Sequence, residues 1–196
     1  MQTSELDRRE ILPRLFPEPE RLLFVSGLAG ASKDMAALTD DGDNLFSMAG
    51  TMGAAVPTGL GIALSAPDRP VAVVTGDGEL LMGLGALVTV AQAAPANLAI
   101  VCLDNGQHGE TGGQVGMTAG SADLAAIARG AGFERCLTVT RENELEGACA
   151  FLAEAGAPRF LHARVRQTPP SAYRRNLDPA ACRLRFRAAV AASARA

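Results

Sequence analysis

Short hydrophobic runs alternate with longer amphipathic or small-residue stretches along most of the chain. Apolar runs of this length, bounded by Gly, Pro or polar residues, predict strands that are buried on both faces. The predicted strands are 21–27, 45–50, 71–75, 98–104, 136–140 and 159–165. The predicted helices are 32–38, 53–66, 79–93, 121–132, 142–156 and 179–192. This alternation predicts an α/β fold, a doubly wound parallel sheet with helices on both faces.

The pattern divides the chain into three segments. Residues 21–166 hold all the predicted strands and are expected to form one domain. A polar, proline-containing lead-in covers residues 1–20, and a tail with one predicted helix covers residues 167–196. With 196 residues, the chain is long enough for one domain with a substantial core.

Capping residues suggest the limits of the predicted helix 121–132. Ser121 is a candidate N-cap, because its hydroxyl can accept a hydrogen bond from a free N–H of the first turn. Gly130 or Gly132 is a candidate stop, because glycine readily adopts the left-handed conformation that ends many helices.

Two polar motifs flanked by glycine follow consecutive predicted strands. Gly76-Asp77-Gly78 comes directly after VAVVT, and Asp104-Asn105-Gly106 ends the run LAIVCLD. In doubly wound sheets, ligands bind beyond the carboxyl ends of the strands, where the strand order reverses. The pattern therefore predicts that both motifs lie on one edge of the sheet.

The chemistry of the first motif favours a metal ion. Flanking glycines let the backbone approach a ligand closely, and the helix that follows offers free N–H groups to a phosphate. Asp77 would repel a phosphate unless a cation lay between them, so we interpret it as a ligand of Mg²⁺ or a similar hard ion. Asn105 and a backbone carbonyl nearby, that of Gln107, would add neutral oxygens. Taken alone, a GDG sequence also occurs in ordinary turns; its pairing with the second motif favours the functional interpretation.

This pair of motifs resembles the diphosphate- and magnesium-binding motif of thiamine diphosphate enzymes, in which GDG is followed after about thirty residues by Asn-Asn or Asp-Asn. The stretch SMAGTMGAAVPTGLGIALS (47–65) is similar to the segment that precedes this motif in decarboxylases and acetolactate synthases. Residues 76–114 further resemble β subunits of sulfopyruvate decarboxylases and the C-terminal halves of phosphonopyruvate decarboxylases. The resemblance implies a thiamine diphosphate-binding fold.

The resemblance also implies roles for individual residues. Those that would hold Mg²⁺ are Asp77, Asn105 and Gln107, the last through its carbonyl. Those that would contact the cofactor are Ser32, Gly50, Met52, Gly76, Asp77, Gly78, Glu79, Asn105, Gln107 and His108. Met52 would be the apolar wedge beneath the bent cofactor and would take part in catalysis by holding that shape. A methionine beside small residues is otherwise a common core filler.

Two residues of the glycine loop 105–120 are further catalytic candidates. His108 can transfer protons near neutral pH or bind an anionic substrate group, and Glu110 lies two positions further on. The alternative for both is an ordinary solvent-facing loop position. Thr111 and Gln114 are weaker candidates, and we interpret His162, inside RFLHARV, as structural.

The resemblance implies a partner as well. Thiamine diphosphate enzymes use a glutamate from a separate pyrimidine-binding domain, and the one predicted domain here is assigned to the diphosphate side. We therefore expect a pyrimidine-binding partner subunit of α type, a hetero-oligomer and a small anionic 2-keto acid substrate, sulfopyruvate or phosphonopyruvate. The sequence departs from these relatives at Glu79, Ala29 and Ala31, which leaves the substrate more open than the cofactor.

Composition adds few constraints. A net charge of −3 gives no reason to expect nucleic acid or a membrane surface as partner, and the arginines of the tail favour a solvated helix face or a subunit contact. The four widely spaced cysteines favour neither a metal site nor a disulfide. The N-terminus carries acids and prolines where a signal peptide needs an apolar run, so we predict a cytoplasmic protein.

Of three alternatives to a decarboxylase subunit, two stay open and the third is disfavoured. A carboligase subunit like acetolactate synthase would use the same motifs. A non-catalytic subunit for binding or assembly is also possible, although Asp77, Asn105 and Met52 are all present. A plain nucleotide-binding domain is disfavoured, because neither GxGxxG nor GxxxxGK[ST] occurs.

Overall fold

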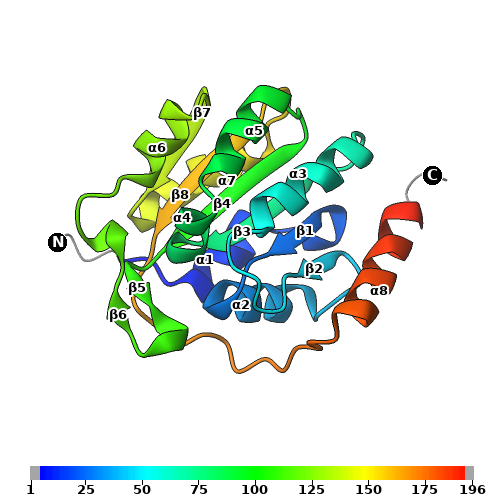
Figure 1. Ribbon diagram of the computed structural model, residues 1–196, viewed down its shortest axis with the longest axis horizontal. Helices are drawn as coiled ribbons and strands as arrows, with labels where there is room; N and C mark the ends of the chain where they lie inside the picture. The colour runs from blue at the N-terminus through cyan, green and yellow to red at the C-terminus, as the bar shows by residue number, and fades with distance from the viewer. Residues whose placement is uncertain (1–4, 193–196) are drawn as a thin grey trace.

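A parallel sheet forms the centre of the molecule (Figure 1). The computed structural model describes residues 5–192. Within them, the strand order of the sheet is β2-β1-β3-β4-β8-β7, and every neighbouring pair is parallel. The strands are β1 (Leu23–Ser26), β2 (Leu45–Ser47), β3 (Val71–Gly76), β4 (Leu98–Asp104), β7 (Arg135–Val139) and β8 (Arg159–Arg164). The predicted doubly wound α/β fold is confirmed.

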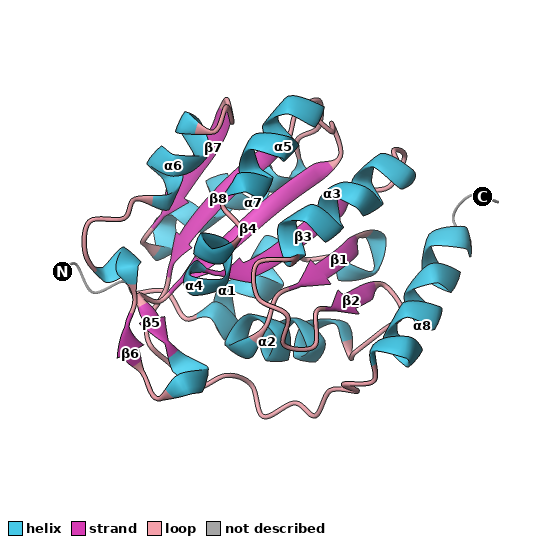
Figure 2. Ribbon diagram, in the orientation of Figure 1, coloured by secondary structure: helices cyan, strands magenta, loops and turns pink. Residues whose placement is uncertain are grey.

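Helices cover both faces of the sheet (Figures 1 and 2). One face packs against α3 (Ala55–Ser65), α5 (Gly85–Ala93) and α6 (Leu124–Gly130). The other face packs against α1 (Arg8–Leu15), α2 (Ala29–Thr39) and α7 (Leu145–Ala153). Two apolar cores result, and β4 is buried at every position because both of its faces are covered.

The register of the central strands brings the two polar motifs to the same level. Strand β3 pairs with β4 from Val71 beside Leu98 to Gly76 beside Leu103. The next residues, Asp77 at the start of α4 and Asp104 at the end of β4, therefore lie at the same level of the carboxyl edge. The strand order reverses between β1 and β3 and again between β4 and β8, so this edge holds the crevices where such sheets bind ligands.

The predicted helix 79–93 is two helices, α4 (Asp77–Met82) and α5. The break lies at Gly83, where only glycine fits, because a Cβ atom there would lie 2.3 Å from the carbonyl oxygen of Gly53. The loop after β2 therefore rests directly on the α4–α5 backbone. Helix α6 is also shorter than predicted, because Asp123 rather than Ser121 caps it, by accepting a hydrogen bond from the Ala126 N–H.

The segments at both ends of the chain contain helices. In the lead-in, Asp7 caps α1, a helix that the sequence pattern did not predict. The predicted helix of the tail is confirmed as α8 (Pro179–Ala192), which packs against the edge strand β2 through Phe186 and Phe46. The predictions for residues 1–4 and 193–196 lie outside the described residues.

The glycine loop after β4 also has structure of its own. It contains a short antiparallel hairpin formed by β5 (Gln107–His108) and β6 (Gln114–Val115). From residue 5 to residue 192, no helix is long and apolar enough to cross a membrane.

Candidate functional site

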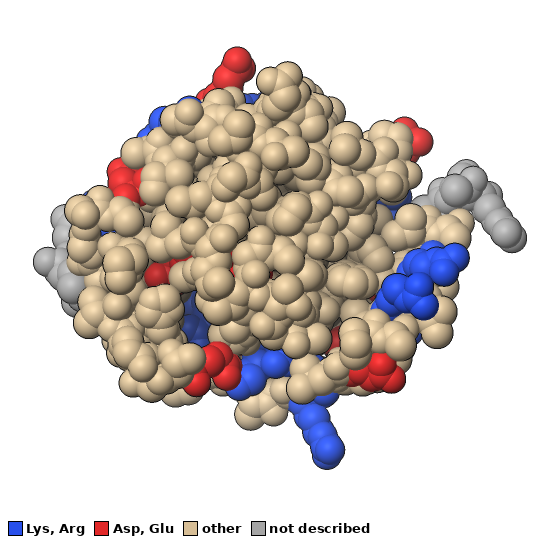
Figure 3. All heavy atoms as spheres, in the orientation of Figure 1, with Lys and Arg blue, Asp and Glu red and all other residues tan. Residues whose placement is uncertain are grey.

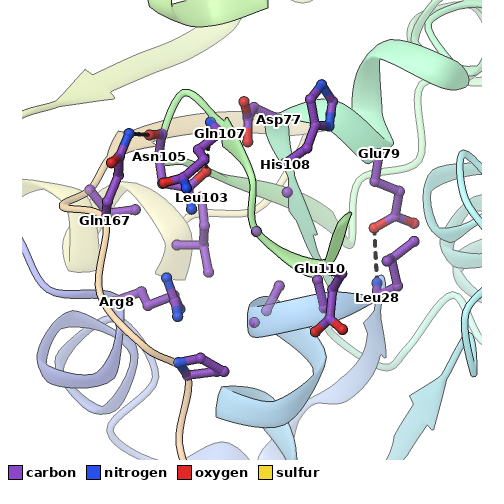
Figure 4. A pocket seen from close by; sticks show the side chains of 18 of the residues that line it. Arg8, Leu28, Asp77, Glu79, Leu103, Asn105, Gln107, His108, Glu110 and Gln167 are labelled. Carbon is purple, nitrogen blue, oxygen red and sulfur yellow. Dashed lines mark hydrogen bonds between the residues drawn. The ribbon is translucent and has the colours of Figure 1, made fainter. Parts of the chain in front are cut away.

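A cavity of about 640 Å³ opens at the carboxyl edge of the sheet (Figure 4). It collects most of the residues that the sequence singled out, although they come from different loops. The predicted site residues that line it are Met52, Gly76, Asp77, Gly78, Glu79, Asn105, Gln107, His108, Glu110 and Thr111. Figure 4 shows Asp77, Asn105 and Gln107 along one side of the cavity and Arg8 across from them. The expected meeting of the two motifs is therefore observed.

Asp77 is a buried acid at the start of α4, with only 3% of its surface exposed. Its Oδ2 atom lies 2.9 Å from the hydroxyl of Thr118, which donates to it. Burial raises the pKa of this carboxyl and the nearby charge of Asp104 raises it further, while the Thr118 hydrogen bond opposes the shift. A buried carboxylate beside a second acid has an unfavourable charge that a cation in the cavity would compensate.

Asn105 and Gln107 follow β4 in a tight turn. The Oδ1 atom of Asn105 accepts a hydrogen bond from the Gln107 N–H at 3.1 Å, and Gly106 between them has a φ of +65°, which favours glycine. Gln167 donates to the carbonyl of Asn105 at 3.3 Å. Asn105 and Gln107 thus line the cavity together with Asp77. One carboxylate with neutral oxygens is a suitable donor set for a hard divalent cation.

Behind Asp77 lies a chain of buried polar side chains. The Thr118 hydroxyl also lies 2.7 Å from Oδ1 of Asp104, whose Oδ2 lies 2.8 Å from Nε2 of His162. Burial alone would raise the pKa of Asp104, but hydrogen bonds from His162 and Thr118 outweigh it and lower the pKa. His162 is buried, in line with its predicted structural role. Sequence reasoning gave Asp104 and Thr118 no role.

Glu79 turns away from Asp77 and toward the β1–α2 turn. Its Oε2 atom accepts hydrogen bonds from the Leu28 N–H at 3.1 Å and from the Thr75 hydroxyl at 2.9 Å. Its Oε1 atom is buried and has no hydrogen-bond partner in the described part of the chain. Burial raises the pKa of this carboxyl. The next residue after Leu28, Ala29, has a φ of +59°, an unusual value for alanine.

The catalytic candidates of the glycine loop both line the cavity. The His108 ring packs on Gly78, where a Cβ atom would lie 2.8 Å from Cε1 of the ring. The carboxylate of Glu110 forms an ion pair with Lys33 of α2 at 3.4 Å. Both residues therefore connect the loop to other elements of the cavity wall, His108 as a half-buried ring and Glu110 as an exposed acid.

The other three residues predicted to contact the cofactor lie at different distances from the cavity: one at its rim, one elsewhere in the same loop and one in the interior of the protein. Met52 lies at the cavity rim and is 38% exposed, so it does not fill the core of this chain. Gly50, with a φ of +100°, lies in the same loop but does not line the cavity. Ser32 is fully buried, and its hydroxyl lies within hydrogen-bond distance of the hydroxyls of Ser26 and Ser47. The structure therefore gives the Ser32 hydroxyl no direct access to the cavity, which contradicts the expected contact.

The floor of the cavity is formed by α1 and by the segment that follows β8. Arg8 of α1 is buried and donates to Asp34 of α2 and to the carbonyl of Thr168. Pro169 and Pro170 continue this wall, and the Ser171 N–H donates to Asp34 at 2.6 Å. Sequence reasoning missed these residues because no local motif links positions so far apart.

Comparison with known proteins identifies the family. A family model described as "Thiamine pyrophosphate enzyme, C-terminal TPP binding domain" matches residues 30–163, more than half of the chain. The chain belongs to this family. Thiamine pyrophosphate is another name for thiamine diphosphate, so the resemblance seen in the two motifs is confirmed, together with the cofactor that it implied.

Two of the relatives found by sequence carry the names of decarboxylases. Phosphonopyruvate decarboxylase of Streptomyces viridochromogenes is 39% identical over 180 residues, which are 91% of this chain and 45% of that protein. Sulfopyruvate decarboxylase subunit beta of Methanothermobacter thermautotrophicus is 41% identical over 128 residues, 65% of this chain and 68% of that subunit. The chain therefore spans less than half the length of the phosphonopyruvate decarboxylase that it matches.

A solved structure supports the fold. The thiamine diphosphate-dependent 4-hydroxybenzoylformate decarboxylase of Rhodococcus jostii RHA1 superposes with a TM-score of 0.67 at 22% identity. The match covers 85% of this chain and 34% of that one. At this identity the likeness concerns the fold alone.

Proposed function

We propose that this chain is the thiamine diphosphate- and Mg²⁺-binding subunit of a 2-keto acid decarboxylase that acts on sulfopyruvate or phosphonopyruvate. The observation that carries the proposal is the meeting of Asp77, Asn105 and Gln107 at one side of a cavity in a chain of this family. The names of the relatives supply the reaction class and the two substrates.

The residues present fit the metal ion. Asp77 is a buried carboxylate whose pKa is raised by burial and by Asp104, so a bound cation would relieve its unfavourable charge. Asp77, the Asn105 amide and the Gln107 carbonyl would hold Mg²⁺. The backbone N–H groups of Gly78 and Glu79 would meet the diphosphate, next to Gly76.

The cofactor supplies the electron sink for loss of CO₂ when it is bound. The protein has to orient it and to keep water away from the reacting carbon. Met52, at the rim, would support the bent shape of the cofactor, with the Gly50 carbonyl beside it. His108 would bind an anionic substrate group or transfer a proton, and Glu110 would hold the loop in place through Lys33.

Basic residues of the cavity support a small anionic substrate. Arg8 and Lys33 both line it, and they come from α1 and α2 respectively. Each already pairs with a carboxylate, Asp34 or Glu110, so an anionic substrate would have to share these cations with the two acids.

We further propose a pyrimidine-binding partner subunit that supplies the catalytic glutamate, as in a hetero-oligomer. The name of the sulfopyruvate decarboxylase relative, subunit beta, supports a second polypeptide. So does the surface over α3, α4 and α5, where Figure 3 shows few charged side chains. The exposed apolar residues on these helices are Leu64, Met82 and Val88. A cytoplasmic location also belongs to this proposal, supported by four free cysteines.

The test is to isolate the protein gently from its own cells with Mg²⁺ in the buffer and to analyse it by native mass spectrometry. We expect a complex with a second chain that carries thiamine diphosphate. The isolated complex should release CO₂ from sulfopyruvate or phosphonopyruvate and not from pyruvate at a comparable rate. A homo-oligomer without cofactor, or a complex that decarboxylates neither substrate, would contradict the proposal.

A further inference from the structure

Thr118 joins the two halves of the proposed metal site. The first half is Asp77 at the start of α4, and the second is the loop after β4, which presents Asn105 and Gln107. Thr118 belongs to this loop, is buried to 1% exposure, and lies 41 positions from Asp77, to which it donates. It does not line the cavity itself, so it acts on the site through the residues that it contacts.

The hydroxyl of Thr118 lies between two carboxylates. It is 2.9 Å from Oδ2 of Asp77 and 2.7 Å from Oδ1 of Asp104. A hydroxyl has one proton and can donate to one acceptor at a time. The pair of acids therefore shares one hydroxyl donor, and of the two acids Asp77 is the one that lines the cavity.

Two further hydrogen bonds hold the carboxylate of Asp104 in place. Its Oδ1 atom accepts a hydrogen bond from the Gly106 N–H at 2.9 Å, and its Oδ2 atom lies 2.8 Å from Nε2 of His162 on β8. Both Asp104 and His162 are almost completely buried. Thr118 is thus anchored to the rigid centre of the sheet, and through it the rotamer of Asp77 is fixed.

A backbone hydrogen bond just before Thr118 joins the two ends of the loop. The Gly116 N–H donates to the Gly106 carbonyl at 2.7 Å. A Cβ atom on Gly116 would lie 3.1 Å from Oδ2 of Asp77 and 2.9 Å from the carbonyl carbon of Gly106. The chain therefore passes tightly past Asp77 just before Thr118, and the turn with Asn105 and Gln107 is fixed at the level of that carboxylate.

We propose that Thr118, supported by Asp104 and His162, is a positioning residue that sets the orientation of Asp77 toward the cation and aligns the loop ligands with it. The inference rests on the proposed function, since it assumes that Asp77 binds Mg²⁺. Outer contacts of this kind orient metal ligands in many proteins, and their loss weakens metal affinity about 10- to 100-fold.

The experiment compares Thr118→Val, Thr118→Ser and the control Thr138→Val in the full chain, with the partner subunit where it co-purifies. Thr138 is a half-buried threonine of the edge strand β7 and does not line the cavity. Free Mn²⁺ is titrated by electron paramagnetic resonance with thiamine diphosphate present, and the melting temperature is measured without metal. We expect Thr118→Val to weaken Mn²⁺ affinity about 10-fold or more. Thr118→Ser, which keeps the hydroxyl, and Thr138→Val should stay within about 3-fold of wild type, less than the effect of losing a residue that orients a metal ligand.

Two outcomes separate the proposals. If wild type does not bind Mn²⁺ with thiamine diphosphate, the proposed function fails. If wild type binds and folded Thr118→Val binds equally well, the positioning role is wrong even if the variant melts earlier. Should Thr118→Val not fold, His162→Gln and His162→Leu replace it. Gln keeps a donor for Asp104 and should retain Mn²⁺ affinity, Leu should lower it, and equal affinities would overturn the proposal.

Discussion

Asp77 and Glu79 lie two positions apart in α4, and both are buried acids whose pKa is raised by burial, but they face different regions. Asp77 faces the loop after β4 and shares the Thr118 hydroxyl with a second acid. Glu79 faces the β1–α2 turn, where a backbone N–H and a hydroxyl donate to one of its oxygens.

The difference shows that the contacts of a buried carboxylate, more than its burial, separate a binding role from a structural one. Asp77 lines the cavity beside a second acid, Asp104, with which it shares the Thr118 hydroxyl, so a cation in the cavity would compensate its charge. One oxygen of Glu79 accepts from two different elements and joins the turns after β1 and β3. This contrast supports our proposal that Asp77 binds the cation, while the Glu79 side chain shapes the cavity wall.

Asp77→Asn should produce the largest effect. It removes the charged member of the proposed ligand set, so Mn²⁺ affinity in the presence of thiamine diphosphate should fall by about 100-fold or more. This loss exceeds the range that is typical when a residue that only orients a metal ligand is replaced. Electron paramagnetic resonance of free Mn²⁺ measures this. Retention of wild-type affinity would remove Asp77 from the site.

The same variant should stabilise the metal-free protein at neutral pH. A carboxyl whose folded pKa is raised binds more protons in the folded state, so its ionisation costs stability as the pH rises from the unfolded value of about 3.9 through the folded value. Asn carries no such penalty. Thermal melts without metal should show Asp77→Asn above wild type at pH 7, with the difference disappearing below about pH 4.

Substitutions of Glu79 should separate the two acids. Glu79→Ala leaves the Leu28 N–H and the Thr75 hydroxyl without their acceptor and should cost about 1–3 kcal/mol of unfolding free energy. Glu79→Gln keeps an acceptor oxygen and should bind Mn²⁺ within about 3-fold of wild type, less than the loss of an outer contact. Urea denaturation gives the free energies. If Glu79→Gln lost metal binding as completely as Asp77→Asn, the contrast between the two acids would be wrong.

Ala29→Gly should produce the smallest effect. Ala29 has a left-handed backbone next to the Leu28 N–H that Glu79 holds, and relief of that strain should outweigh the extra flexibility of glycine in the unfolded chain by at most about 1 kcal/mol. The gain should shrink in a Glu79→Ala background, where the turn is free to relax. Equal gains in both backgrounds, in a double-mutant cycle, would show that Glu79 does not hold the turn.

Much of the fold follows from the local pattern. The buried strands β3 and β4 are continuous apolar runs, and the two motifs after them reach one edge because parallel strands end together. Asp77 and Asn105 could therefore be placed without a structure. The break between α4 and α5 could not, because it depends on the close approach of Gly53 to Gly83, which are distant in sequence.

The surroundings of the site were less predictable. The direction of Glu79, the contact of Thr118 with Asp77 and the position of Arg8 each depend on which distant element packs against the residue. Ser32 shows the converse: it lies in the expected turn region, but its hydroxyl points into a cluster of serines. A motif fixes the position of a residue in the chain more reliably than the contacts of its side chain.

The cavity floor has a consequence for the dynamics of the protein. The Arg166 N–H donates to the Leu6 carbonyl at 2.7 Å, and Arg8 reaches the Thr168 carbonyl across the floor, so the segment after β8 is joined to the segment around the start of α1. Local opening of either segment would therefore open the cavity, and an occupant of the cavity would slow amide hydrogen exchange in both segments together. A fragment limited to residues 30–163 would keep the two motifs and lose both this floor and β1 from the middle of the sheet.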